Sequence, residues 1–279
     1  MKIAITGASG MLGRALCRTF GDGFEVSPWR SRDLDITSLA DVRRRIAQLR
    51  PDWIVNPAAY TAVDRAESEA VQACRVNALG SRHLAMAASE TGCRLLTFST
   101  DYVFDGESKR PYLESDPVCP INEYGRSKWM GEDYVRNLCR RHLIVRTSWL
   151  YGPGGQNFAD EMLRQAADRS ELEVVDDQVG SPTYSRDLAA KTLELVELGG
   201  QGTYHVTNSG QCSKYEFACR TFEISNLKVT VHPVPSSKFP RPAPRPRYSV
   251  LESRRLLRDS IPPMRPWQDA LADYLESKQ

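Results

Sequence analysis

Two tyrosine–lysine pairs in the sequence have a spacing that suits catalysis. Tyr124 precedes Lys128 by four residues in YGRSK, and Tyr274 precedes Lys278 by four residues in YLESK. A tyrosine can give a proton to a substrate oxygen, but its ordinary pKa of about 10 is too high for efficient transfer at neutral pH. A nearby ammonium group stabilises the phenolate and lowers that pKa. The spacing alone does not decide between the two pairs.

The surroundings of the first pair favour it. Thr100 follows an apolar run that is predicted to be a strand, and the helix expected to carry Tyr124 comes next. Residues four apart on a helix share a face, so both side chains of the pair can point into one cleft. We expect the Thr100 hydroxyl to hydrogen-bond the substrate oxygen near Tyr124. No glycine turn or strand end leads into YLESK, so Tyr274 is expected to pack and Lys278 to be solvated.

A glycine-rich turn near the N-terminus predicts a dinucleotide site. Gly7, Gly10 and Gly13 are spaced G-x-x-G-x-x-G between an expected strand and an expected helix. Gly7 would allow a tight turn, Gly10 would let a pyrophosphate approach the backbone, and Gly13 would let the helix pack closely on the sheet. The free N–H groups of the helix would then face the anion. A purely structural turn is the alternative, but this context favours dinucleotide binding.

The end of the second expected strand bears on the choice of cofactor. A carboxylate there would bind the ribose of NAD, but residues 27–32 (SPWRSR) contain no acidic residue, and the next one is Asp33. Arg30 and Arg32 can instead pair with a ribose 2′-phosphate. NADP(H) is therefore the preferred cofactor and NAD(H) the alternative. Two solvated surface arginines are the competing interpretation. Asp35 and Ile36 come slightly later and could contact the adenine.

These residues need a scaffold, and the hydrophobic pattern predicts one in the first half of the chain. Strands are expected at Lys2–Thr6, Phe24–Ser27, Trp53–Asn56, Arg94–Ser99 and Leu143–Thr147, with helices at Met11–Phe20, Leu39–Leu49, Ala66–Glu90 and Gly125–Arg140. This alternation predicts an α/β fold with a doubly wound parallel sheet of the Rossmann type. Ligands of such a sheet bind beyond the carboxyl ends of its strands.

The second half of the chain is less regular. Helices are expected at Asn157–Arg169, Arg186–Leu198, Lys214–Ile224 and Trp267–Ser277, and strands at Leu172–Val175, Thr203–Val206 and Val229–Val234. We predict a dinucleotide-binding domain over residues 1–150. Residues 151–279 are expected to form a smaller, partly interleaved substrate-binding part, with some segments returning to the first domain. The proline-rich stretch from Pro233 to Arg247 predicts an extended surface segment.

The composition is that of an ordinary globular chain. The 279 residues are 41% hydrophobic and 26% charged, and the net charge of +2 is too small to imply a nucleic-acid or membrane partner. No apolar run has the length of a membrane span, and no signal peptide is expected after Met1. Seven scattered cysteines without a C-x-x-C pair indicate reduced thiols, mostly in the core of a cytoplasmic protein. The four histidines lie far apart, and no metal site is expected.

Several motifs occur in order along nearly the whole chain: the glycine turn, NPAAYTAVDRAES, STDYVFDG, YGRSK, RTSWLYG, NF, DDQVGSPT and RPRYS. With them the chain resembles the extended short-chain dehydrogenases/reductases, and among these the dTDP-4-dehydrorhamnose reductase family. AVDRAE, STDYVF and DDQVGSPT are the more specific motifs. The resemblance implies reduction of dTDP-4-dehydro-β-L-rhamnose to dTDP-β-L-rhamnose by hydride transfer from NAD(P)H to C4. That reaction is the last step of dTDP-L-rhamnose synthesis.

The resemblance also implies roles for residues. Tyr124 would protonate the C4 oxygen, Lys128 would lower the tyrosine pKa and hold the nicotinamide ribose, and Thr100 would complete the triad. The residues expected at the cofactor, by motif or by resemblance, are Gly7, Ser9, Gly10, Met11, Leu12, Gly13, Arg30, Asp35, Ile36, Ala58, Ala59, Tyr60, Thr61, Tyr124 and Lys128. Those expected at the substrate are Val63, Thr100, Asp101, Tyr102, Tyr124, Trp149, Asn157 and Arg245, the last as a diphosphate contact.

Some features depart from the family pattern or leave alternatives open. Pro57 stands where a residue with a backbone N–H is more usual. Some members use an acidic residue after the third glycine for a metal-linked dimer, but Arg14 would repel a cation there. We therefore expect no such bridge, and either a monomer or a homodimer. The alternatives are a related nucleotide-sugar epimerase or dehydratase, and a non-catalytic NADP-binding subunit similar to the β subunit of methionine adenosyltransferase. The intact set of Thr100, Tyr124 and Lys128 favours the reductase.

Overall fold

A six-stranded sheet forms the centre of the protein, which a computed structural model describes over residues 1–278. Its strand order is β10-β5-β4-β3-β1-β2, and every neighbouring pair is parallel. The strands are β1 (Lys2–Ile5), β2 (Glu25–Pro28), β3 (Trp53–Asn56), β4 (Arg94–Thr100), β5 (His142–Thr147) and β10 (Gly202–His205). The predicted α/β fold with a parallel Rossmann-type sheet is confirmed.

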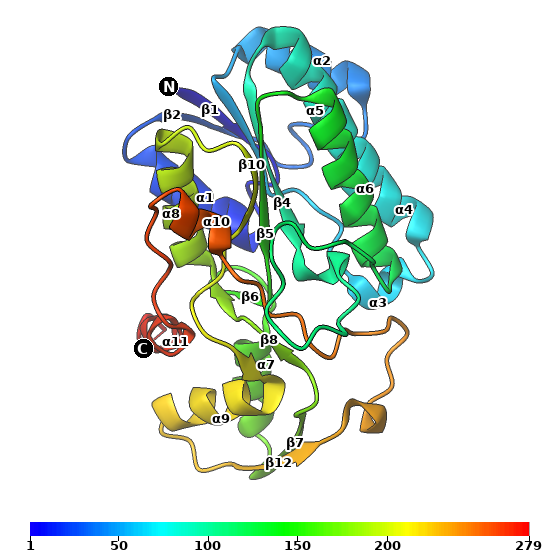
Figure 1. Ribbon diagram of the computed structural model, residues 1–279. Coiled ribbons are helices and arrows are strands. Elements are labelled where there is room, and N and C mark those ends of the chain that lie inside the picture. The colour runs from blue at the N-terminus through cyan, green and yellow to red at the C-terminus, as the bar shows by residue number, and fades with distance from the viewer. Residues whose placement is uncertain (279) are drawn as a thin grey trace.

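Helices cover both faces of this sheet (Figure 1). On one face lie α1 (Met11–Gly21) and α8 (Ser185–Glu197), and on the other lie α2 (Leu39–Leu49), α5 (Gly80–Thr91) and α6 (Glu123–Leu138). Ile3 and Ile5 belong to one buried cluster, whereas Ala4 between them belongs to the other. Successive side chains of a strand point to opposite faces, so each strand contributes to two cores. The sheet is therefore doubly wound.

The connection between β3 and β4 contains more helical segments than the one or two helices expected over Ala66–Glu90. It contains α3 (Val63–Ala66), α4 (Ala70–Cys74), the π-helical turn η1 (Arg75–Leu79) and α5. Asn77 in this turn accepts a hydrogen bond from the N–H of Tyr60 at 2.8 Å, and its amide group donates to the Tyr60 carbonyl and to Oγ of Ser127. Single π-turns are frequent at functional sites. Here the turn ties the loop after β3 to α6.

The second half of the chain forms a smaller layer beyond the carboxyl ends of the sheet (Figure 1). It contains α7 (Phe158–Ala166), α9 (Lys214–Ile224), α11 (Trp267–Glu276) and the short turn η3 (Ser236–Lys238). The turn η2 (Asp101–Val103) belongs to the first half and directly follows β4. The strands of the smaller layer pair as β7 (Glu171–Val175) with β12 (Thr230–Val234), β6 (Leu150–Tyr151) with β9 (Thr183–Tyr184), and β8 (Val179–Gly180) with β11 (Cys212–Ser213). The two-residue strands were not expected from the sequence.

Three segments of the second half lie on the large sheet (Figure 1). Strand β10 pairs with β5, α8 packs against α1, and α10 (Arg254–Arg258) packs against β10. The domain boundary near residue 150 stays a prediction. These segments of the second half are the ones that return to the first domain. No helix among residues 1–278 has the length and apolar character needed to cross a membrane. The seven cysteines are free thiols, but Cys93, Cys139 and Cys212 alone are fully buried, fewer than expected.

The second tyrosine–lysine pair is structural. Tyr274 on α11 is buried in an aromatic cluster with Tyr151, Tyr184 and Phe217. Its hydroxyl donates to Oδ1 of Asp160 at 2.7 Å, and Lys278 forms an ion pair with the same carboxylate. Tyr274 therefore packs, and Lys278 is anchored rather than freely solvated.

Candidate active site

The glycine turn has the geometry that the spacing predicted. Gly7 has a φ of 53°, and a Cβ on Gly13 would lie 2.2 Å from the carbonyl oxygen of Gly7. No side chain of the described residues caps α1, whose N-cap is Gly10, so N–H groups of its first turn remain available to an anion. This combination fits the pyrophosphate of a dinucleotide.

The turn opens into a cleft of about 900 Å³ at the carboxyl ends of the sheet strands. Thirteen of the fifteen residues expected at the cofactor line it: Gly7, Ser9, Gly10, Met11, Leu12, Gly13, Asp35, Ile36, Ala58, Ala59, Thr61, Tyr124 and Lys128. Arg30 is exposed and outside this lining, and Tyr60 turns away to donate to Glu69 at 2.7 Å. Ser31, Leu34 and Thr37 line the cleft without having been expected.

Thr100, Tyr124 and Lys128 meet in this cleft. Asn122 caps α6 by accepting from the N–H of Gly125 at 2.8 Å, which starts the helix two residues before the expected Gly125. Lys128 is buried, and its Nζ donates to the carbonyl of Phe98 on β4 at 2.7 Å. The Thr100 hydroxyl donates to Oδ1 of Asp101 at 3.0 Å. Strand β4 therefore holds both the lysine and the threonine.

The charge states of the pair differ from the expectation. Burial raises the pKa of Tyr124 to about 12, and the Thr100 hydroxyl acts in the opposite direction. Burial also lowers the pKa of Lys128 to about 8, against the attraction of Glu132. The expected lowering of the tyrosine pKa is not seen, because loss of water around the phenol outweighs other effects. Tyr124 is therefore a protonated acid at neutral pH.

A buried ion pair lies behind Lys128. Glu132, one turn further along α6, accepts from Nε and Nη2 of Arg146 on β5 at 2.9 and 2.8 Å. Both side chains are at most 2% exposed. Arg146 also approaches Nε2 of His205 at 3.4 Å, and burial lowers the pKa of that imidazole to about 3. The neutral histidine leaves Glu132 as the buried counter-charge to Arg146.

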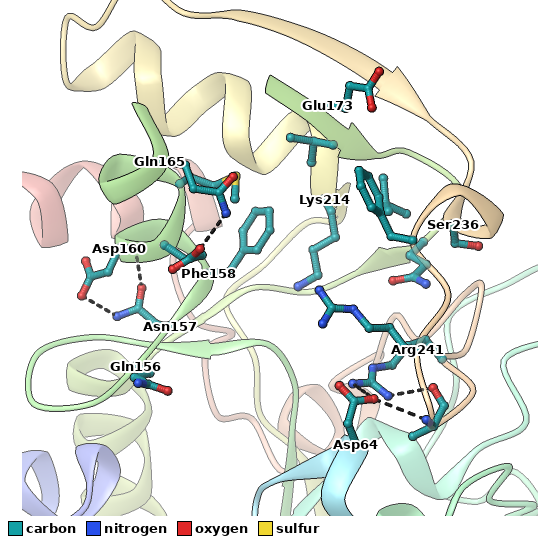
Figure 2. A pocket seen from close by; sticks show the side chains of 18 of the residues that line it. Asp64, Gln156, Asn157, Phe158, Asp160, Gln165, Glu173, Lys214, Ser236 and Arg241 are labelled. Carbon is teal, nitrogen blue, oxygen red and sulfur yellow. Dashed lines mark hydrogen bonds and ion pairs between the residues drawn. The ribbon is translucent and has the colours of Figure 1, made fainter. Parts of the chain in front are cut away.

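A second cleft of about 1090 Å³ adjoins the first, since Gly155 and Gln156 line both. It lies among α7, the start of α9 and the proline-rich segment (Figure 2). Of the residues expected at the substrate, Asn157 and Arg245 line it, whereas Thr100, Asp101, Tyr124 and Trp149 line the first cleft. The Arg245 guanidinium is already paired with Asp64 at 3.0 Å and donates to the carbonyl of Ala243.

The remaining expected substrate residues lie beside these clefts. Tyr102 packs edge-on against Tyr124 with ring centroids 5.9 Å apart, and Val63 begins α3; neither lines either cleft. Trp149 has a φ of 44°, which is unusual for a bulky residue and costs backbone energy. Its indole lies against Gly180, where a Cβ would come within 2.5 Å of the ring. Sequence reasoning missed Lys214, which lines the second cleft.

Comparisons with known proteins show which family shares this architecture. The family model described as RmlD substrate binding domain matches residues 1–279. A dTDP-4-dehydrorhamnose reductase of Streptomyces griseus is 45% identical over 277 residues, covering 96% of this chain and 91% of that protein. A solved dTDP-4-dehydrorhamnose reductase of Clostridium acetobutylicum has 42% identity and a TM-score of 0.98, with full coverage of both chains.

A second solved structure bears on the cofactor. The dTDP-4-dehydrorhamnose reductase of Bacillus anthracis in complex with NADP is 40% identical, has a TM-score of 0.97, and covers 99% of each chain. The family model and these relatives extend over nearly the full length, so the similarity includes both clefts. The chain belongs to the RmlD substrate binding domain family.

Proposed function

We propose that this protein is an NADPH-dependent oxidoreductase that reduces dTDP-4-dehydro-β-L-rhamnose to dTDP-β-L-rhamnose. The observation that carries the proposal is that Thr100, Tyr124 and Lys128 line the same cleft as the glycine turn. That cleft is continuous with a second one, which is large enough for a nucleotide sugar. The family membership and the NADP complex of a relative support both the reaction and the cofactor.

Tyr124, Thr100 and Lys128 each have a separate role in the reduction of the C4 carbonyl group. The reduced nicotinamide supplies the hydride when the cofactor is bound. Tyr124, protonated at neutral pH, gives its proton to the oxygen that becomes the C4 hydroxyl. The Thr100 hydroxyl turns its one proton from Oδ1 of Asp101 to that oxygen. The ammonium group of Lys128 favours the phenolate that Tyr124 leaves behind. The phenolate is reprotonated from solvent, which completes the proton balance.

The nucleotide part of the substrate is assigned to the second cleft. Residues 151–279 supply most of its lining, while the first domain supplies Asp64. We take the substrate-binding part to be this region, with α8, β10 and α10 as the segments that belong to the dinucleotide domain. Arg14, whose Nε donates to the carbonyl of Ser9 at 2.8 Å, stands where a metal-linked dimer would need an acid. A monomer or a homodimer without such a metal is the proposed assembly.

The test follows the absorbance of reduced nicotinamide when dTDP-4-dehydro-β-L-rhamnose is added, with NADPH and NADH in parallel. Substrate-dependent oxidation that is faster with NADPH is expected, with dTDP-L-rhamnose as the product. Bound NADPH that is never oxidised would contradict the reductase and favour a non-catalytic subunit. Interconversion of sugars without net loss of NADPH would instead favour an epimerase.

A further inference from the structure

The side chain of Lys214 occupies an unusual position in the second cleft. Lys214 is the first residue of α9, whose start is fixed by a capping box between Ser213 and Glu216. Its Nζ lies 3.2 Å from the ring centroid of Trp149 and 4.9 Å from that of Phe158. The aromatic faces hold the ammonium group in place through cation–π attraction. Lys214 is therefore a positioned side chain rather than a mobile surface lysine.

The ammonium group is not matched by a partner within the described part of the chain. Lys128, Lys191 and Lys238 each donate to an oxygen. The contacts of the Lys214 ammonium group within residues 1–278 are instead with the two aromatic rings, which leaves its three donors for a ligand. The other cations of the cleft differ: Arg245 pairs with Asp64, and Arg164 pairs with Glu161. Arg241 also points into the cavity in Figure 2, but it lies on the exposed proline-rich segment.

The charges around Lys214 make an anion the fitting ligand. Burial disfavours its charged form and lowers its pKa to about 7. Cys212 on β11 and Asp101 on η2 oppose that shift, whereas Arg245 on the proline-rich segment adds to it. An ammonium group with three unused donors, near the paired guanidinium of Arg245, suits an anion with several acceptor oxygens. A diphosphate presents such oxygens, and a neutral sugar or base does not.

We propose that Lys214 is a substrate-anchoring residue whose ammonium group, held on the face of Trp149, binds the diphosphate of the nucleotide sugar. This inference rests on the proposed function, because it takes a nucleotide sugar as the ligand of the second cleft. The stacking also gives Trp149 a second role, since a diphosphate bound to Lys214 is fixed relative to the indole. Trp149 lines the first cleft together with Thr100, Tyr124 and Lys128. A diphosphate bound to Lys214 would therefore be held at a fixed position relative to these residues.

The first experiment measures binding of dTDP and of thymidine to the full chain by calorimetry. Lys214→Met keeps the length of the side chain but removes the charge. We expect its affinity for dTDP to fall about 10- to 100-fold, the size of a lost charge-assisted hydrogen bond. Thymidine affinity and NADPH affinity should stay unchanged, which a general loss of structure would not allow. Lys214→Arg should retain most of the dTDP affinity.

A matched control comes from another lysine near the cleft. Lys238 is paired with Glu173 at 2.5 Å and does not line the cavity itself. Lys238→Met makes the same substitution and should leave dTDP affinity within about 2-fold, as for an exposed pair. Equal losses in the two methionine variants would indicate long-range electrostatics and overturn the direct contact.

Proton uptake provides a second measurement. The diphosphate of dTDP-glucose, being a diester, has no group that titrates near neutral pH. Because an anion favours the charged lysine, wild type should take up protons when it binds dTDP-glucose at about pH 8, measured in buffers of different ionisation enthalpy. Lys214→Met should take up clearly fewer protons when it binds dTDP-glucose under the same conditions. The same uptake in both proteins would overturn the proposal.

The outcomes separate this inference from the proposed function. If wild type binds dTDP and Lys214→Met binds it equally well, the role of Lys214 is wrong and the reductase assignment stands. If wild type binds NADPH but neither dTDP nor dTDP-glucose, the substrate class is wrong, and the role of Lys214 falls with it.

Discussion

Tyr124 and Lys128 lie one helical turn apart on α6, yet the ammonium group of Lys128 donates to the carbonyl of Phe98 on β4 at 2.7 Å. The strand that ends in Thr100 therefore also holds the lysine. Burial keeps the pKa of Tyr124 at about 12 and lowers that of Lys128 to about 8. At neutral pH the site thus holds a protonated phenol near an ammonium group, which are the charge states that reduction of a ketone requires.

Tyr124→Phe should keep NADPH binding but lower kcat by about 100-fold or more, because the general acid is removed while the shape of the site is kept. The measurement is steady-state oxidation of NADPH by the keto-sugar, together with NADPH affinity. Tyr274→Phe is the matched control. It removes the bond to Asp160 and should lower stability by about 1 kcal/mol with little effect on kcat. Near-normal turnover by Tyr124→Phe would remove this residue from the mechanism.

Gly13→Ala should weaken NADPH binding and lower the melting temperature. The new Cβ would lie 2.2 Å from the carbonyl oxygen of Gly7, so either α1 or the glycine turn must move. Gly21→Ala at the other end of α1 is the control, since no atom lies within 4 Å of its Cβ position. That variant should bind NADPH normally and be as stable as wild type. Identical behaviour of the two variants would show that close packing at Gly13 is unimportant.

Glu132→Gln should destabilise the protein by about 3 to 5 kcal/mol, because it leaves the buried Arg146 cation without its counter-charge. The double variant Glu132→Gln with Arg146→Met should recover part of that loss, since no unpaired charge remains. Arg136 pairs with the same carboxylate but is partly exposed, and Arg136→Met should cost at most about 1 kcal/mol. Urea unfolding of wild type, of the single variants Glu132→Gln and Arg146→Met, and of the double variant measures the coupling between the two residues in a double-mutant cycle. Additive losses in the double variant would show that the pair is not coupled.

Asp101→Asn should change how stability depends on pH. Burial raises the pKa of Asp101 from 3.8 to about 6, so its protonated form is favoured in the folded state. The stability that this carboxyl contributes is fully present below its unfolded pKa and is lost as the pH rises through about 6. Asparagine avoids the buried charge, so the variant should be more stable than wild type by about 2 to 3 kcal/mol at about pH 8, with little difference at about pH 4.

Urea unfolding at both pH values tests this prediction. A stability difference that is independent of pH would mean that Asp101 is not the titrating group. Asp101 also lines the first cleft, together with Tyr124 and Lys128, and accepts from the Thr100 hydroxyl, so the more stable variant should turn over more slowly. Such a trade of activity for stability is usual where a site keeps an unfavourable buried charge.

Much of the fold was accessible to prediction because its signals are local. The alternation of apolar runs and helical patterns placed all six strands of the large sheet within one or two residues. The glycine turn stood out because Gly7 needs a positive φ and Gly13 a close approach, and only glycine meets both demands. The two-residue strands β6, β8, β9 and β11 carry no periodicity of their own, since they are defined by their partners.

The sequence by itself determined the order of the strands and main helices of the large sheet, the glycine turn before α1, and which tyrosine–lysine pair follows a strand end. Three contacts depend on the tertiary structure alone. Asn77 hydrogen-bonds both Tyr60 and Ser127, and so joins the loop after β3 to α6. Arg245 pairs with Asp64, and the ammonium group of Lys214 lies on the ring of Trp149. These contacts join residues separated by many positions, and their side chains have no spacing to reveal them. Burial, which also depends on the whole fold, raised the pKa of Tyr124 to about 12 and lowered that of Lys128 to about 8.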